Sequence, residues 1–391
     1  MKKTIAILGS TGSIGVSTLS ITDKKKENFK IFLLSANKNF TLICHQIKKY
    51  KPKIFIISDK FIFEKIKKKI NPKKTILLNN FNQVKLKKKI DISISAIPGV
   101  AGLPPTVDFI KFSKKILIAN KESIICGWNL IKHNSQKYKT KIVPVDSEHF
   151  SISKLLENHK LNEIKKIYIT ASGGPFLFLK KNKFKTIKPK DALRHPKWKM
   201  GKKITIDSAT MMNKILELIE AQKLFNIPKE KLDILIHPQS LVHAIIVFKN
   251  GLTKFLYHPT SMIIPIANAI YDDKLNIEDF MNIQKNRKKD IEKDLSFIKV
   301  NHKIFPMIKL KKKINEYPST PIIINAANEV LVDQFLRNKL PFLGIFKTIK
   351  SILNDKKYKK YAIKRANNLN QINMIDDWTK KLTYKKIKTY E

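Results

Sequence analysis

Between Thr4 and Val145, short apolar runs alternate with Lys-rich amphipathic stretches. The runs read TIAIL, KIFLLSA, KIFIIS, TILL, DISISAI, KILIAN and KIVPV. Unbroken apolar runs are typical of strands covered on both faces, and their alternation with helical patterns is typical of a parallel sheet with helices on both sides. This pattern predicts an α/β fold whose N-terminal domain, residues 1–146, is a doubly wound parallel sheet.

The pattern changes after residue 146. Glycines and polar motifs in TASGGPF and HPKWKMG precede a strong helical pattern, SATMMNKILELIEAQKLF, and then strands in ILIHPQSLVHAIIVF and TKFLYH. We therefore expect a central α+β domain over residues 147–272. The charged, poorly periodic stretch 273–300 is expected to be a linker, and the mostly helical pattern of 301–391 predicts a C-terminal α-helical domain.

The composition narrows the classes of partner. The 391 residues include 78 Lys+Arg against 31 Asp+Glu, a formal charge of +47, which ordinarily indicates nucleic acid or an anionic membrane. Here the excess is nearly all Lys and is spread over many short runs, so we expect neither partner. With only two cysteines a disulfide framework is excluded. The first apolar run stops at Gly9, and no run reaches the roughly 18 apolar residues of a membrane span, so a cytoplasmic protein is expected.

A glycine-rich loop, GSTGSIG at residues 9–15, separates the first expected strand from a helical pattern. Its backbone can approach a pyrophosphate closely, and the following helix N-terminus supplies amide donors. The spacing is G-x-x-G-x-x-G rather than G-x-G-x-x-G, and an ordinary strand-to-helix turn is the alternative. Its position at the first strand-helix junction favours nucleotide binding and a Rossmann-like domain.

The end of the second expected strand indicates which nucleotide. An NAD site typically has an acidic residue there, whereas this strand ends in SANKN. Asn37, Lys38 and Asn39 offer donors and a positive charge that suit a 2′-phosphate, so NADPH is favoured over NADH. The alternative is that Lys38 is one more surface lysine.

Two carboxylates stand close together in VDSEHF, at Asp146 and Glu148. In an extended segment, residues i and i+2 project to the same side. Neighbouring carboxylates repel unless a proton or a cation is shared, and oxygen donors of this kind suit Mg²⁺ or Mn²⁺. A surface turn with two solvated acids is the alternative.

A third carboxylate comes from the expected helix at 207–221. Asn213, Lys214 and Glu217 are spaced i,i+3 and i,i+4 and share one side of the helix, with Ser208 at its start as a capping hydroxyl. This spacing predicts an anion site at the N-terminal end and a metal-binding carboxylate one turn later. A simple surface pair between Lys214 and Glu217 is the alternative.

Two loops are candidates to close over such a site. SGGPF at 172–176 presents Ser172 and backbone amides to a phosphate, and HPKWKMG at 195–201 is a candidate lid. Alternatively, His195 is a surface or capping residue and Trp198 a core aromatic. His237 and His243 are not favoured as zinc ligands, because no cysteine or close histidine pair accompanies them.

Taken together and in order, GSTGSIG, SANKN, ANKES, PVDSEH, SGGPF, HPKWKMG, DSATMMNK, HPQS and NAANE resemble the 1-deoxy-D-xylulose 5-phosphate reductoisomerase family over nearly the whole chain. The chain departs from the family pattern at Phe150 and Ser151, at Pro98 and at Asn37. None of these departures removes a residue that the resemblance makes a ligand.

The resemblance implies roles for individual residues. Three carboxylates would hold a divalent metal, Mg²⁺ or Mn²⁺, and with Lys121 they would be catalytic: Asp146, Glu148 and Glu217. The residues implied in substrate binding are Lys121, Ser147, Glu148, Ser172, His195, Trp198, Ser208, Asn213, Lys214 and Glu217. Those implied in NADPH binding are Thr11, Gly12, Ser13, Ile14, Asn37, Lys38, Asn39, Asn120, Glu122 and Gly201.

The implied activity is an NADPH-dependent and metal-dependent conversion of 1-deoxy-D-xylulose 5-phosphate to 2-C-methyl-D-erythritol 4-phosphate. This reaction belongs to the non-mevalonate pathway of isoprenoid precursors, and the family implies a homodimer. The rival interpretation is another NADP-dependent dehydrogenase with the same first domain, which would need no three-carboxylate metal site.

Overall fold

The computed structural model describes residues 2–70, 74–198, 200–282 and 294–388. The chain divides into two compact units. Unit 1 comprises Met1–Ser123, Asn129–Asp146 and Ser261–Ile291, and unit 2 comprises Ile124–Trp128, Ser147–Thr260 and Glu292–Glu391. The finer division into domains at 1–146, 147–272 and 301–391 with a linker at 273–300 stays a prediction, and residues 283–293 of that linker lie outside the described residues.

Unit 1 is built on a parallel sheet in the order β4-β3-β2-β1-β5-β6-β7. The expected apolar runs all form its strands, and the predicted doubly wound sheet is confirmed. The strands are β1 (Lys3–Leu8), β2 (Phe29–Ala36), β3 (Ile54–Ile57), β4 (Ile76–Leu78), β5 (Ile90–Ser95), β6 (Ser113–Ile118) and β7 (Lys141–Pro144).

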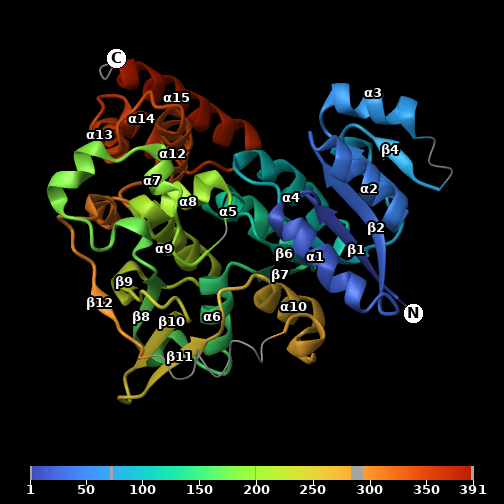
Figure 1. The fold of residues 1–391 in the computed structure, drawn as a ribbon, viewed down its shortest axis with the longest axis horizontal. Coiled ribbons are helices and arrows are strands. Elements are labelled where there is room, and N and C mark those ends of the chain that lie inside the picture. Colours follow the sequence, from blue (N-terminus) through green and yellow to red (C-terminus); the bar gives the residue numbers. More distant parts are fainter. Residues whose placement is uncertain (1, 71–73, 199, 283–293, 389–391) are drawn as a thin grey trace. The chain divides into compact units, whose positions relative to one another are not determined.

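The helices of unit 1 alternate with these strands, and α10 joins them from far along the sequence. Figure 1 shows α10 beside α1, and Ile266 and Ile270 of α10 belong to the core that Ile5 and Ile7 of β1 form. The helices are α1 (Ser13–Lys24), α2 (Phe40–Tyr50), α3 (Lys60–Lys69), α4 (Leu103–Ile110), α5 (Lys121–Lys137, which enters unit 2 at 124–128) and α10 (Ile263–Tyr271).

A buried lysine fixes the end of α10 to the sheet. Lys115 of β6 places Nζ 2.8 Å from the Ala269 carbonyl oxygen and 2.9 Å from Asp272 Oδ1. Burial lowers the pKa of Lys115 and outweighs the attraction of Asp272. The ammonium therefore acts as a polar anchor for a segment that the core otherwise holds by apolar contacts.

Unit 2 contains a mixed sheet in the order β11-β10-β8-β9-β12, in which β8 and β9 are parallel and the other neighbours antiparallel. Two helices, α6 (Ser147–Leu155) and α9 (Met212–Phe225), pack on this sheet and on each other. The strands are β8 (Ile164–Ala171), β9 (Leu232–Ile236), β10 (Val242–Phe248), β11 (Thr253–Tyr257) and β12 (Ile298–Lys299).

Helices make up the rest of unit 2, as the pattern after residue 301 predicts. In Figure 1 the C-terminal helix α15 lies along α12 and α13. The helices are α7 (Pro189–Ala192), α8 (Lys202–Thr210), α12 (Thr320–Leu336), α13 (Phe342–Leu353), α14 (Tyr358–Ala362) and α15 (Leu369–Ile387).

The single helix expected over 207–221 is two helices, which corrects the position of Ser208. Met211 has φ +66°, in the left-handed region, and ends α8 before α9 begins at Met212. Ser208 thus lies in the last turn of α8, where its carbonyl accepts the Met211 amide at 3.1 Å, and is no N-terminal cap. Asn213 and Lys214 instead occupy the first turn of α9.

None of the helices in the described ranges is both long enough and apolar enough to cross a bilayer.

The placement of α10 in the core of unit 1 can be tested at Ile270, which is 0% exposed. We expect Ile270→Ala to lower the free energy of unfolding by about 2–5 kcal/mol, because it removes buried methyl groups and leaves a cavity. Ile76→Ala, at a position 53% exposed in β4, is the matched control and should change it by less than about 0.5 kcal/mol. Urea unfolding measures both. Similar losses in the two variants would contradict the assignment of α10 to this core.

Candidate active site

The glycine loop of unit 1 requires glycine at two positions. Gly9 has φ +92°, and a Cβ there would lie 2.8 Å from the Ala96 carbonyl oxygen. A Cβ on Gly15 would lie 2.4 Å from the Gly9 carbonyl oxygen, so the first turn of α1 packs directly on the loop. Gly12 meets nothing closer than 3.5 Å, and no side chain caps α1. The loop therefore leaves backbone amides at a helix N-terminus open to a phosphate.

The neighbouring strand holds this loop in place. The amides of Gly9 and Ser10 donate to the Ser35 carbonyl at 3.1 and 2.7 Å, and Gln46 Nε2 donates to the Ser10 carbonyl at 2.9 Å. Thr11, Ser13 and Ile14 follow in the loop and the start of α1. Because β1 is central and β2 and β5 flank it, the loop lies at the point where the strand order reverses, the usual nucleotide site of such sheets.

The other residues expected at the cofactor lie at element ends. Asn37, Lys38 and Asn39 are exposed after β2, and Asn39 Oδ1 caps α2 by accepting the Leu42 amide at 3.1 Å. Asn120 caps α5 and donates its side-chain amide to the carbonyls of Ile97 and Gly99, followed by buried Glu122. Gly201 belongs to unit 2, where it precedes α8 with no atom within 4 Å of a Cβ.

The two neighbouring carboxylates do not lie on one extended segment, which corrects the alternation argument. β7 ends at Pro144 and α6 begins at Ser147, so Glu148 is in the first turn of a helix, with Ser147 Oγ donating to its Oε2 at 2.5 Å. Asp146 is the residue at which the chain leaves unit 1. Lys121 Nζ lies 2.8 Å from Asp146 Oδ2, and both side chains are largely buried.

Lys214 joins the other two carboxylates inside unit 2. Its Nζ contacts Glu148 Oε1 of α6 and lies 2.7 Å from Glu217 Oε2 of α9. Burial by itself would lower the pKa of Lys214, but the charges of Glu148 and Glu217 outweigh it and raise the pKa. Asn213 donates its amide to Glu217 Oε1, so the expected i,i+3 and i,i+4 contacts on this helix are confirmed.

These carboxylates fit a divalent ion chemically. One oxygen each from Asp146, Glu148 and Glu217 lie within 4.8 Å of one another. Carboxylate oxygens are the ligands that Mg²⁺ and Mn²⁺ prefer. Asp146 also belongs to a second group of possible ligands, with His149 and Glu220, in which His149 offers a nitrogen donor.

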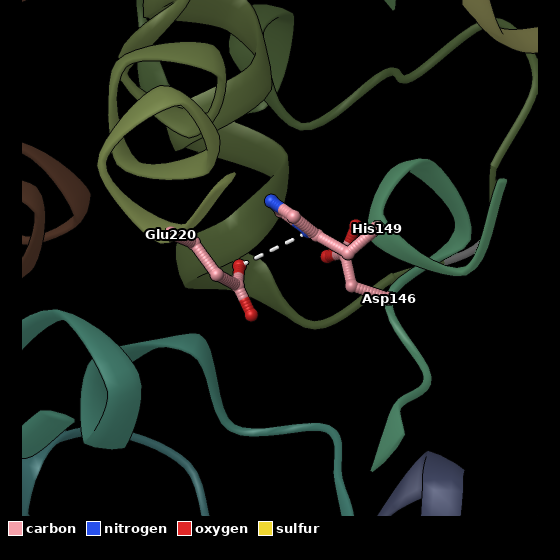
Figure 2. Close-up of side chains that lie close together, drawn as sticks. All are labelled: Asp146, His149 and Glu220. Atoms are coloured by element: carbon pink, nitrogen blue, oxygen red, sulfur yellow. Dashed lines mark ion pairs between the residues drawn. The ribbon is translucent and has the colours of Figure 1, made fainter. Parts of the chain in front are cut away.

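Figure 2 shows a buried pair that sequence reasoning missed, His149 and Glu220. His149 Nε2 lies 3.0 Å from the Glu217 carbonyl, which only accepts, so Nε2 carries a proton. Nδ1 lies 3.3 Å from Glu220 Oε2, and both side chains are buried. The pair thus ties α6 to α9 one residue from Glu148 and three from Glu217.

A second cluster of polar side chains centres on His195. Its Nδ1 accepts the backbone amides of Lys197 and Trp198 at 3.1 and 2.9 Å, and its Nε2 lies 3.1 Å from both Ser172 Oγ and Ser208 Oγ. Two amides on Nδ1 leave that nitrogen unprotonated, so Nε2 carries the proton. Burial, followed by the charge of Lys214, lowers the pKa of His195 to about 4. The imidazole is neutral near pH 7.

The SGGPF loop comes close to α8 because of its glycines. Gly173 and Gly174 have φ of +83° and +62°, and a Cβ on Gly174 would lie 3.2 Å from Ala209 Cα. The Gly174 amide donates to Ser172 Oγ at 3.1 Å. Ser172, His195 and Ser208, from three separate segments, are thereby brought together, as a shared anion site requires.

The histidines of the HPQS segment are not brought together as metal ligands. His237 stacks on Phe297 with ring centroids 4.8 Å apart, and His243 stacks on His258. Within the described residues, neither belongs to a group of side chains that could hold a metal ion.

Comparison with known proteins decides the family. The family model of the 1-deoxy-D-xylulose 5-phosphate reductoisomerase matches residues 5–127. A model of the C-terminal domain of this reductoisomerase matches residues 142–225, and a model of the DXP reductoisomerase C-terminal domain matches residues 258–382. A relative of that name from Pelagibacter ubique (strain HTCC1062) is 48% identical over 387 residues, covering 97% of each chain. The chain belongs to the 1-deoxy-D-xylulose 5-phosphate reductoisomerase family.

Other members of the reductoisomerase family agree over the whole length. The relative from Thermodesulfovibrio yellowstonii is 38% identical over 99% of this chain and 100% of its own. A reductoisomerase solved with NADPH, fosmidomycin and magnesium superposes with a TM-score of 0.89 at 30% identity, covering 99% of this chain and 98% of that one. The Zymomonas mobilis reductoisomerase in complex with NADPH gives 0.86 at 30% identity, covering 99% of both.

The neutral state of His195 has a consequence for acid stability. A histidine whose folded pKa is about 4, below its ordinary 6.5, contributes stability above pH 6.5 that is lost as the pH falls toward 4. We therefore expect the stability difference between the parent and His195→Asn to shrink steadily from pH 7 to pH 4. Urea unfolding of both proteins along this pH series measures it. A difference that grows on acidification would show that His195 is protonated in the folded protein.

The pair of His149 and Glu220 can be tested by a double-mutant cycle. Glu220→Leu removes the buried carboxylate that lies 3.3 Å from His149 Nδ1, so we expect a loss of about 3–5 kcal/mol in the free energy of unfolding. Adding His149→Leu should restore part of that loss, because an apolar pair needs no partner. Denaturant unfolding of both single variants and the double variant gives the coupling energy. Losses that simply add would mean that the two side chains stabilise α6 and α9 independently.

Proposed function

We propose that this chain catalyses the rearrangement of 1-deoxy-D-xylulose 5-phosphate and its reduction by NADPH to 2-C-methyl-D-erythritol 4-phosphate, a step of the non-mevalonate isoprenoid pathway. The observation that carries the proposal is 48% identity to a named reductoisomerase over 97% of both chains. The residue chemistry supports it, since a nucleotide loop, a three-carboxylate group and a serine-histidine cluster occur in one chain. It is an NADPH-dependent oxidoreductase.

NADPH binds unit 1 in this proposal. The open amides of loop 9–15 suit the pyrophosphate, and Lys38 suits the 2′-phosphate that distinguishes NADPH from NADH. Reductoisomerases of similar structure have been solved with NADPH. The protein's task is to hold the nicotinamide at the carbon that receives the hydride.

The divalent ion is proposed to bind Asp146, Glu148 and Glu217. When bound, it supplies a Lewis acid that polarises substrate oxygens during both the rearrangement and the reduction. Three carboxylates against the ammonium groups of Lys121 and Lys214 leave one negative charge, which a divalent cation more than balances. Lys214 has to release carboxylate oxygens to the ion, and its ammonium then becomes available to an oxygen of the substrate.

The substrate phosphate is proposed to bind at the cluster around His195. There Nε2–H and the hydroxyls of Ser172 and Ser208 are donors that need no change of protonation at neutral pH. Trp198 follows on the same loop, with its backbone amide on His195 Nδ1. Phosphate binding at this imidazole therefore orders the loop, which uses binding energy from a remote group to position the reacting carbons.

The charge of the chain favours both proposed ligands, which are polyanions. A formal charge of +47 raises the local concentration of anions at the surface and speeds their encounter with the enzyme. This gives the Lys excess an effect on association without any nucleic-acid partner.

Assembly and location are also part of the proposal. A homodimer is supported by β11, which is an edge strand of its sheet. Phe255 of this strand and Leu252, the residue before the strand begins, are exposed apolar side chains. A cytoplasmic location is supported by the presence of only two cysteines, Cys44 and Cys126, in 391 residues, because disulfide-dense chains belong to oxidising compartments.

The assay of the proposed reaction follows NADPH absorbance with 1-deoxy-D-xylulose 5-phosphate and Mn²⁺ or Mg²⁺. We expect oxidation that stops in EDTA and falls by more than roughly a hundredfold in Glu217→Gln, which removes a negative charge from the proposed metal group. Glu157→Gln, an exposed acid just after α6, is the control and should keep parental activity. Mn²⁺ binding measured by electron paramagnetic resonance should weaken in Glu217→Gln alone. Metal-independent oxidation would favour an ordinary NADP-dependent dehydrogenase.

A further inference from the structure

Four aromatic side chains of unit 2 form a continuous row, called here the ring column: Trp198, His243, His258 and Phe150. The rings of Trp198 and His243 lie 6.1 Å apart at 71°. His243 and His258 stack with centroids 3.9 Å apart and an interplanar angle of 17°. Phe150 meets the edge of His258 at 6.2 Å and 67°. These separations are those of rings in contact, so the column runs from the loop before α8 to helix α6.

Hydrogen bonds fix both imidazoles of the column. His258 Nδ1 lies 2.9 Å from the Pro259 carbonyl oxygen, and His243 Nε2 lies 3.2 Å from the His258 carbonyl oxygen. Carbonyls only accept, so each of these nitrogens carries a proton. His258 is 6% exposed, and burial, then the proximity of His243, lowers its pKa to about 3. The ring of His258 therefore stays neutral at neutral pH and adds no charge to its stack with His243.

Trp198 is held from two sides. Its backbone amide donates to His195 Nδ1 at 2.9 Å, and its ring rests on His243. The first contact fixes the backbone of the loop, whereas the second fixes the direction of the side chain. Since His243 is packed face to face on His258, the position of the indole depends on His258 through the ring of His243.

We propose that His258 is a positioning residue for Trp198: through His243 it fixes where the indole of Trp198 rests, next to the proposed phosphate site at His195. The inference rests on the proposed function, in which His195 and the neighbouring Trp198 serve the sugar phosphate. Phe150 extends the same contact to α6, two residues after the proposed metal ligand Glu148. His258 acts through other rings and has no direct contact with substrate.

Two substitutions separate the ring from its hydrogen bond. His258→Asn keeps a donor for the Pro259 carbonyl but removes the ring, and His258→Phe keeps a ring but removes the donor. We expect the Asn variant to raise KM for 1-deoxy-D-xylulose 5-phosphate by roughly three- to tenfold, the worth of one aromatic contact, with KM for NADPH unchanged. The Phe variant should stay within about twofold of the parent. The opposite order of the two variants would overturn the proposal.

A double-mutant test with Trp198 distinguishes a positioning role of His258 from a general contribution to stability. In a Trp198→Leu background, His258→Asn should raise KM by no more than about twofold, because the ring that it positions is gone. His159→Asn, which removes another histidine ring packed on this sheet, at 4.5 Å from Phe248, is the control and should leave KM unchanged in either background. If the effect of His258→Asn multiplies in full with that of Trp198→Leu, His258 has only a structural role.

Tryptophan fluorescence tests the column without substrate. The spectrum of Trp198 is obtained by subtracting that of Trp198→Leu, which keeps Trp128 and Trp378. We expect His258→Asn to move the Trp198 emission to longer wavelength, as the indole loses its packing, and His258→Phe to leave it unchanged. An unmoved emission in a folded Asn variant overturns the proposal.

These readouts separate the two possible failures. A parent that does not oxidise NADPH with the sugar phosphate refutes the proposed function, whereas the fluorescence shift still tests the column. Thermal unfolding checks that each variant folds. If His258→Asn does not fold, His258→Leu, which fills the space without a ring, takes its place with the same expected shift.

Discussion

The contacts of the Lys214 ammonium with Glu148 and Glu217 are the interactions on which the carboxylate-bearing part of unit 2 depends. The ammonium joins α6 to α9 at the point where both helices carry carboxylates, which would otherwise repel each other in a buried place. His149 and Glu220 form a second link between the same helices, one residue after Glu148 on α6 and three after Glu217 on α9. Two links fix the rotation of α6 relative to α9 as well as their separation, and the carboxylates are therefore held in place before any ion binds.

Helix ends and hydrogen-bond partners decide the chemistry of each site more than residue type does. His195 is neutral near pH 7 because burial and the charge of Lys214 lower its pKa, and two backbone amides on Nδ1 leave its proton on Nε2. Likewise, Lys121 and Lys214 are two of a great many lysines, yet their burial beside carboxylates sets them apart from those on the surface. In a chain as basic as this one, burial and carboxylate partners together distinguish these two lysines from most of the others.

The sequence predicts unit 1 well because its physical signal is local. The central strands β1, β3 and β5 are largely buried between neighbouring helices, so their apolar composition alone marks them. The break at Met211 is invisible in the same way of reasoning, since Met211 and Met212 continue an apolar helical pattern and only the backbone changes direction. Because of this break, Ser208 lies in the last turn of α8 instead of at the start of a helix. Its Oγ lies 3.1 Å from His195 Nε2.

What the sequence could not supply are contacts between polar residues far apart in the chain. His149 and Glu220 are 71 positions apart by number, and each looks like a surface residue until α6 and α9 pack together. The same holds for His243 and His258, which meet only because β10 and β11 pair as antiparallel neighbours. A motif marks the residues that touch a ligand, because they gather in short segments. The residues that hold those segments in position are scattered, and only the tertiary fold makes them neighbours.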